Sequence, residues 1–303
     1  MNNDKGILLE SGTNELEIVE FRIGENFFGI NVAKVREIIP FMKTIRIPNS
    51  HPCIKGIFKP RDLVITAVDL PKYLNLSDED ADAGARYIIS HFNKTTVGFL
   101  VHEVVGIHRI SWENVEKPDE TIFSGQEGIA TGIVKMPEKL VVVLDFEKIL
   151  VDISPNTGIQ MSEVSKMGPR VRSEKPILIA EDSKMLTHIL LEALTTAGYT
   201  SVTITSNGKE AWEALEAYRE NEKLPLEEKV ALVITDIEMP QMDGHSLTKK
   251  IKTDKVLSKL PVIIFSSLID EQMHQKGVAL GADDQITKPE IGRLVSSIDR
   301  LIL

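Results

Sequence analysis

The sequence predicts two domains, an antiparallel all-β domain in the first half and an α/β domain with a parallel sheet in the second. The 303 residues exceed the usual size of one domain. Up to about residue 153 the chain shows many short strand patterns and little helix, which is typical of an antiparallel barrel or barrel pair. From residue 175 strand and helix patterns alternate, which is typical of a doubly wound, five-stranded parallel sheet.

The boundary between the halves is predicted within residues 154–174. Ser, Gly, Pro and charged residues dominate there without a sustained period, which is typical of a linker. We therefore expect an N-terminal tail over residues 1–13, a first domain over 14–153, and a second domain over 175–303.

Strand patterns of the first domain begin with Glu15–Ile23, where apolar and polar residues alternate. Similar alternation marks parts of Arg86–Phe92 and Thr95–Val101, and β-branched runs cover residues 129–134 and 140–144. Short helical patterns are predicted at three places: Val32–Ile39, Leu70–Leu74 and Phe146–Leu150.

Four apolar runs of the second domain each end at a residue that can contact a cation or a phosphoryl group. Buried parallel strands read as such runs, and ligands bind beyond their carboxyl ends. The runs and the residues after them are 176–180 before Glu181 and Asp182, 230–235 before Asp236, 261–265 before Ser266, and 284–287 before Lys288. Three carboxylates, a hydroxyl and an ammonium group are therefore expected at one small site.

Such a site fits a magnesium ion and a phosphoryl group. Magnesium prefers oxygen ligands and usually takes one or two carboxylates, here Asp182 and Asp236, with Glu181 reaching it through water. Met-Pro and Asp-Gly pairs predict a loop after Asp236, which would turn the backbone carbonyl of Glu238 toward the metal. A lone aspartate at a strand end is more often a turn residue or a helix cap, and this is our interpretation of Asp243. Caps do not explain the joint pattern.

These motifs resemble the receiver domain of two-component response regulators over about residues 175–303. The matching segments are Ala180–Ser183, Thr235–Gly244, Phe265–Ser267, Gly281–Asp283 and Thr287–Pro289. The resemblance implies a flavodoxin-like fold and a cis peptide bond between Lys288 and Pro289.

The resemblance also implies the role of each site residue. Asp236 would be phosphorylated to 4-aspartylphosphate, in a phosphorelay, by self-catalysed transfer and dephosphorylation. Ser266 would be the switch hydroxyl and Lys288 the phosphate contact. Magnesium, the cofactor, would be held by Glu181, Asp182, Asp236 and the carbonyl of Glu238.

The second domain departs from the family at two positions. Gln285 stands where the family usually has an aromatic residue that rotates inward during the switch. Glu238 places a carboxylate near the path of hydrolytic water, so we expect an altered lifetime of the acyl phosphate.

The first domain shows no catalytic motif. It lacks a nucleophile elbow, a zinc-protease motif and a glycine-rich phosphate loop, so an enzymatic output is disfavoured. A formal charge of −10 disfavours nucleic-acid binding. No apolar stretch approaches the length of a membrane helix, and the single cysteine, Cys53, fits a reducing cytoplasm.

The first domain resembles the CheW family of chemotaxis coupling proteins. The resemblance rests on Phe27–Ile39, Ile47–Ser50, Ile54–Gly56, Leu63–Leu70, Gly132–Val134 and Val141–Asp145. That family folds as two small five-stranded barrels and bridges chemoreceptor tips to the histidine kinase CheA. The resemblance suggests four partner contacts: Val35, Glu37, Gly56 and Arg61.

A CheW-like half joined to a receiver resembles the CheV type of coupling protein. The resemblance implies an adaptor in a cytoplasmic array of membrane chemoreceptors, whose coupling of receptors to CheA is set by phosphorylation of Asp236 and serves adaptation. The alternative is a phosphate sink for CheA that does not regulate coupling. Neither hypothesis includes an enzyme acting on other substrates, a nucleic-acid partner or direct membrane insertion.

Overall fold

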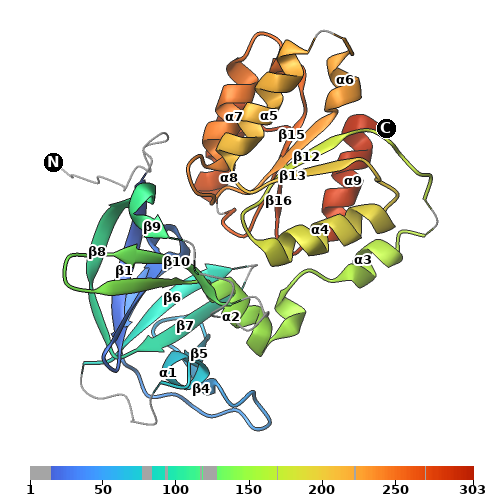
Figure 1. Cartoon of the computed structure of the whole chain (residues 1–303). Helices are drawn as coiled ribbons and strands as arrows, with labels where there is room; N and C mark the ends of the chain where they lie inside the picture. The colour runs from blue at the N-terminus through green and yellow to red at the C-terminus, as the bar shows by residue number, and fades with distance from the viewer. Residues whose placement is uncertain are drawn as a thin grey trace, which may run out of the picture. The chain divides into compact units, whose positions relative to one another are not determined.

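The computed structural model describes residues 15–76, 84–92, 95–116, 118, 128–168, 170–221, 223–269 and 271–303. These residues form two compact units, residues 15–158 and residues 159–303 (Figure 1). The predicted tail over residues 1–13 lies outside the described residues. Within the described ranges, no helix has both the length and the apolar character needed to cross a bilayer.

Two β-sheets make up the first unit. Their strand orders are β8-β1-β2-β11-β10-β9 and β3-β6-β7-β5-β4. The neighbouring strands run antiparallel except for the pairs β11–β2 and β5–β7. The strands are β1 (Glu15–Ile23), β2 (Asn26–Asn31), β3 (Val35–Pro40), β4 (Ile54–Phe58), β5 (Ile65–Asp69), β6 (Arg86–Phe92), β7 (Thr95–Val101), β8 (Glu103–Ser111), β9 (Val115–Glu116), β10 (Ala130–Lys135) and β11 (Leu140–Leu144).

The largest core of the first unit joins both sheets to a helix. Phe21 of β1 and Phe99 of β7 both pack against Phe146, at ring-centroid distances of 5.9 and 4.2 Å. Phe146 begins α2 (Phe146–Ile153), whose N-terminus is capped by the side chain of Asp145. This helix and α1 (Leu70–Tyr73) confirm two of the three predicted helical pieces.

The third predicted helical piece, Val32–Ile39, is wrong. Only Val32–Lys34 form a turn of 3-10 helix, and β3 follows from Val35 to Pro40. Exposure alternates along β3, and the strand pairs with β6. The β-branched residues Val35, Ile38 and Ile39 favour this pleated, half-buried surface.

The second unit contains the predicted five-stranded, all-parallel sheet. Its order is β13-β12-β14-β15-β16. The strands are β12 (Ile177–Ala180), β13 (Val202–Thr205), β14 (Leu232–Thr235), β15 (Val262–Ser266) and β16 (Asp284–Thr287). The helices are α3 (Met161–Ser165), α4 (Lys184–Thr196), α5 (Gly208–Glu220), α6 (Leu226–Lys229), α7 (Gly244–Thr253), α8 (Glu271–Leu280) and α9 (Ile291–Ile302).

Helices cover both faces of this sheet (Figure 1). Ile177 and Ile179 of β12 face a core shared with α4 and α9, whereas Leu178 and Ala180 face a core shared with α5 and α7. This alternation follows from the period of two along a strand. Helix α8 buries no apolar side chain, because its one buried residue is Gly277.

Residues 154–174 carry structure that their composition does not reveal. A 3-10 turn spans Pro155–Thr157, and α3 spans Met161–Ser165. Val164 is buried in the core that lies beside α4 and α9. Further along, Ser173 forms a β-bridge with Tyr199. The part of this segment after residue 158 therefore packs as a portion of the second unit.

Candidate functional site at the sheet edge

The carboxyl ends of three parallel strands bring Glu181, Asp236 and Lys288 together. The Lys288 Nζ atom lies 2.9 Å from Glu181 Oε2 and 2.9 Å from Asp236 Oδ2. The three residues are 3%, 8% and 2% exposed. Because these charged groups are buried, their attraction offsets the loss of hydration only while the ammonium stays close to both carboxylates.

An all-oxygen cation site overlaps this ion-pair network. One carboxylate oxygen each from Glu181, Asp182 and Asp236 lies within 4.8 Å of the others. Asp182 is exposed, so water can reach the cluster from that side. Hard oxygen donors with room for water are the ligands that magnesium prefers. The residues present therefore fit the predicted magnesium ion.

The electrostatics of the cluster favour an added positive charge. Burial raises the pKa of Glu181 well above its ordinary value, Lys288 opposes this rise, and the charges of Asp236 and Asp182 add to it. One ammonium group therefore does not fully compensate the carboxylates. A divalent cation would stabilise their ionised forms.

Local backbone features place Asp236. Its Oδ1 atom accepts a hydrogen bond from the Ile237 N–H, 2.6 Å away. A β-carbon at Gly244 would lie 1.9 Å from the Asp236 carbonyl oxygen, so glycine permits the loop to fold back on the strand end. Asp243 caps α7 by accepting from the Ser246 N–H at 2.8 Å, which confirms its interpretation as a cap.

The other predicted residues lie on the same edge of the sheet. Ser266 is the last residue of β15 and is fully buried, and its carbonyl accepts from the Lys288 N–H at 3.1 Å. The peptide bond between Lys288 and Pro289 is cis, as predicted. Glu238 is half-buried in the loop after β14.

Gln285 is buried on β16 and is held by α8. Its Nε2 atom donates to the carbonyl oxygen of His274, 2.8 Å away. The Gln285 side chain also fills the space beside Gly277, where a β-carbon would lie 2.2 Å from Oε1. The predicted departure from an aromatic residue is thus matched by a complementary glycine on the neighbouring helix.

The four predicted partner contacts of the first unit differ in exposure. Val35 and Glu37 lie on β3, at one edge of the five-stranded sheet, and Val35 packs partly into the core. Gly56 is buried with a φ of 141°, and a β-carbon there would lie 2.3 Å from the Ile45 carbonyl oxygen. Arg61 is exposed in the turn after β4. Glycine at position 56 therefore permits a backbone conformation that a side chain would exclude, whereas the Arg61 side chain is accessible to a partner.

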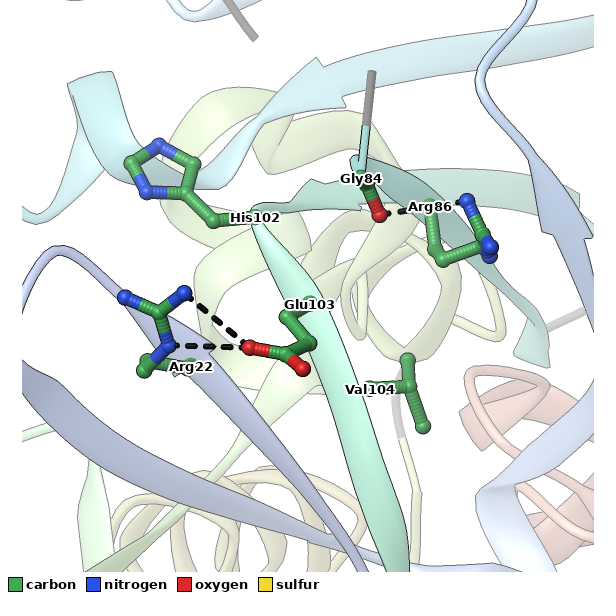
Figure 2. A pocket seen from close by; sticks show the side chains of 6 residues that line it. All are labelled: Arg22, Gly84, Arg86, His102, Glu103 and Val104. Carbon is green, nitrogen blue, oxygen red and sulfur yellow. Dashed lines mark hydrogen bonds and ion pairs between the residues drawn. The ribbon is translucent and has the colours of Figure 1, made fainter. Parts of the chain in front are cut away.

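A surface hollow of about 390 Å³ also lies on the first unit (Figure 2). Arg22 and Glu103 form an ion pair across it at 3.0 Å, and Arg86 donates to the Gly84 carbonyl at 3.1 Å. His102 and Val104 complete the lining. The hollow contains none of the predicted site residues, and its guanidinium groups already have partners.

Comparison with known proteins relates both units to described families. Residues 17–154 match the CheW-like domain, and residues 177–299 match the response regulator receiver domain. The chain is 31% identical to the chemotaxis protein CheV3 of Helicobacter pylori, over 95% of each protein. The chain belongs to the CheV family of chemotaxis proteins.

Two further relatives align with most of this chain. The CheV1 protein of Helicobacter pylori is 25% identical, over 91% of this chain and 89% of CheV1. The sensor histidine kinase CheAY of the same organism is 22% identical over 91% of this chain, but the match covers 33% of that kinase. This CheV-family chain is therefore a chemotaxis signalling protein with a CheW-like unit and a receiver unit, as predicted.

Proposed function

We propose that this CheV-family protein couples chemoreceptors to the histidine kinase CheA, and that phosphorylation of Asp236 regulates the coupling during adaptation. The contact of Lys288 with both Asp236 and Glu181 carries the proposal, because it places the nucleophilic carboxylate of Asp236 beside a positive charge in a buried site. The CheW-like unit supplies the surface for the kinase and for receptor tips, in the cytoplasm at receptor arrays. The protein acts on no other substrate.

The phosphoryl group would come from a phosphohistidine of CheA. An Asp236 Oδ atom attacks in line and forms the new O–P bond, while the P–N bond breaks and the imidazole nitrogen keeps its electron pair. Lys288 then contacts a phosphoryl oxygen, and the Ser266 hydroxyl donates to another. Glu181, Asp182, Asp236 and the carbonyl of Glu238 would hold a magnesium ion, which would neutralise charge on the transferred group.

Glu238 also bears on how long the acyl phosphate persists. Its side chain is half-buried in the loop that follows Asp236. A carboxylate near the path of the hydrolytic water changes how that water is oriented. Glu238→Asn is therefore expected to change the decay rate of the phosphorylated protein, and an unchanged rate contradicts this role.

Transfer of labelled phosphate from CheA tests the site. The wild type should be labelled in the presence of magnesium, and Asp236→Asn should not. Asp243→Asn is the matched control, because asparagine caps a helix about as well as aspartate. Labelling of Asp236→Asn at the wild-type rate would contradict the assignment of Asp236.

Binding of the array tests the adaptor role separately. Immobilised CheA and receptor fragments should retain the wild type and Asp236→Asn alike, because the CheW-like unit is unchanged in the variant. A protein that CheA labels but that neither immobilised partner retains would instead support the phosphate-sink hypothesis.

A further inference from the structure

The segment that leads into the receiver packs on the face formed by α4 and α9. Val164 of α3 is 2% exposed and belongs to the same core as Leu190 of α4 and Leu294 of α9. Met161 and Met167 pack partly against this core. Burying these apolar side chains explains why a helix of five residues forms here, since such a short helix is not stable alone.

Glu163 of α3 supplies the missing cap of α9. Its Oε2 atom accepts a hydrogen bond from the Gly292 N–H, 3.1 Å away. Glu290, the residue at the N-cap position of α9, makes no capping hydrogen bond with its own side chain. A carboxylate at a helix N-terminus satisfies a free N–H group and interacts favourably with the helix dipole.

The capped turn is continuous with the residue that contacts Asp236. Gly292 lies four positions after Lys288, and two backbone hydrogen bonds brace the turn over residues 287–291. The Glu290 N–H donates to the Thr287 carbonyl at 3.0 Å, and the Ile291 N–H donates to the Pro289 carbonyl at 2.6 Å. A displacement at Lys288 therefore reaches the first N–H groups of α9 through a short, stiff turn.

A second anchor holds the segment at the other end of α9. Arg170 pairs with Asp299 and donates through Nε to the Ala197 carbonyl at 2.8 Å. The Tyr199 hydroxyl donates to the same carboxylate of Asp299. Asp299 lies near the C-terminal end of α9, eleven positions after Lys288. Release of α3 can therefore occur while the chain stays attached at Arg170.

We propose that residues 159–168 form a clasp on the receiver that phosphorylation of Asp236 loosens, so that the signal reaches the CheW-like unit through the connecting segment. The inference rests on the proposed function, because it requires phosphorylation at Asp236. When the ammonium of Lys288 turns to a phosphoryl oxygen, the turn moves and the Gly292 N–H leaves Glu163. The clasp directly follows residue 158, where the first unit ends.

The environment of Gln285 favours transmission of the signal through the turn after Lys288, rather than through α8. In the described structure the Gln285 amide is tied to the His274 carbonyl, and Gly277 lies against it. A side chain held in this way does not rotate when the Ser266 hydroxyl moves, whereas the aromatic side chain usual in the family does. The turn from Lys288 to Gly292 provides a direct connection that does not pass through Gln285.

Hydrogen exchange of the full-length protein tests the clasp. Beryllium fluoride with magnesium serves as the mimic of the phosphoryl group, and a bound ¹⁹F NMR signal that Asp236→Asn lacks reports that the site is filled. Once it is filled, exchange over residues 159–168 should rise about fivefold, the factor expected for the loss of one helix cap. Unchanged or slower exchange with the site filled overturns the clasp alone, whereas no bound signal in the wild type overturns the proposed function and the clasp with it.

Three variants separate the clasp from general loosening. Glu163→Ala should show fast exchange over residues 159–168 before the mimic is added, with little further rise. Glu163→Gln keeps an acceptor and should recover part of the wild-type response. Glu174→Ala removes an exposed carboxylate of the same segment and should behave as the wild type. An equal response of Glu163→Ala and Glu174→Ala would contradict the role of the Glu163 cap.

Discussion

The side-chain nitrogen of Gln285 donates a hydrogen bond to the His274 carbonyl oxygen, 2.8 Å away, and so ties β16 to α8. Helix α8 buries only Gly277, so apolar packing contributes little to its position. The polar contact from Gln285 is therefore a main attachment of this helix to the sheet.

Glycine is expected to be necessary at position 277, because the side chain of Gln285 occupies the space that a β-carbon would need. Alanine normally stabilises a helix relative to glycine by about 1 kcal/mol. At this position its β-carbon would lie 2.2 Å from the Gln285 Oε1 atom, so Gly277→Ala should destabilise the receiver by about 1–3 kcal/mol. Urea unfolding followed by Trp212 fluorescence in a Trp112→Phe background measures the change. In a Gln285→Ala background the same substitution should be neutral or stabilising, and an equal loss in both backgrounds contradicts the pairing.

His245 predicts a loss of receiver stability in mild acid. Burial, followed by the positive charge of Lys276, lowers the pKa of His245 to about 4, while Asp243 and a backbone hydrogen bond with Met273 oppose the shift. The unfolded state therefore binds more protons between about pH 4 and 6.5, and stability falls as the pH falls through this range.

The size of this effect can be isolated by substitution. From pH 7 to pH 5 the wild type should lose about 2 kcal/mol more of its unfolding free energy than His245→Gln, which does not titrate. Urea titrations of both proteins at the two pH values measure the difference. Equal losses would show that His245 is not held neutral by the fold.

Lys288 is expected to stabilise the receiver most when magnesium is absent. Lys288→Met leaves Glu181 and Asp236 buried without their shared counter-charge, so the unfolding free energy should fall by about 3 kcal/mol. Added magnesium should recover more stability in this variant than in the wild type. Thermal unfolding with and without magnesium measures both effects, with the exposed Lys249→Met as the control. An identical magnesium effect in both proteins would argue against a shared site.

The predicted partner contacts of the CheW-like unit should separate into two groups. Gly56→Ala should destabilise the unit by more than 1 kcal/mol, because its φ of 141° and the nearby Ile45 carbonyl exclude a β-carbon. Arg61→Ala should leave stability unchanged and weaken binding to CheA or to receptor fragments. Unfolding and binding measured on the same samples distinguish the two roles, and a stability loss in Arg61→Ala would contradict its assignment as an accessible contact.

The sequence predicted that Glu181, Asp236 and Lys288 lie together, because strand ends and charged residues coincide there. Each apolar run stops at the polar residue that the parallel sheet carries to its edge, so Glu181, Asp236 and Lys288 meet without further information. The cap that Asp243 forms on the helix directly after it is equally local, and this interpretation is confirmed.

Features that depend on tertiary contacts were predicted poorly. Residues 32–39 have mixed periods, and pairing with β6 makes most of them a strand. The clasp was missed because α3 has five residues and its composition resembles a linker. The capping role of Glu163 depends on Gly292, which is 129 positions away in sequence. The signal available in the sequence was Val164 with Met161 and Met167, three apolar residues at intervals of three.

The most direct test of the account follows kinase activity in reconstituted receptor–CheA assemblies while phosphoryl transfer to this protein is measured. The wild type should be labelled, and its labelling should change receptor control of the kinase, whereas Asp236→Asn should bind the assemblies and leave that control constant over time. If the wild type is labelled and kinase control is identical with both proteins, regulated coupling by this CheV-family protein is contradicted.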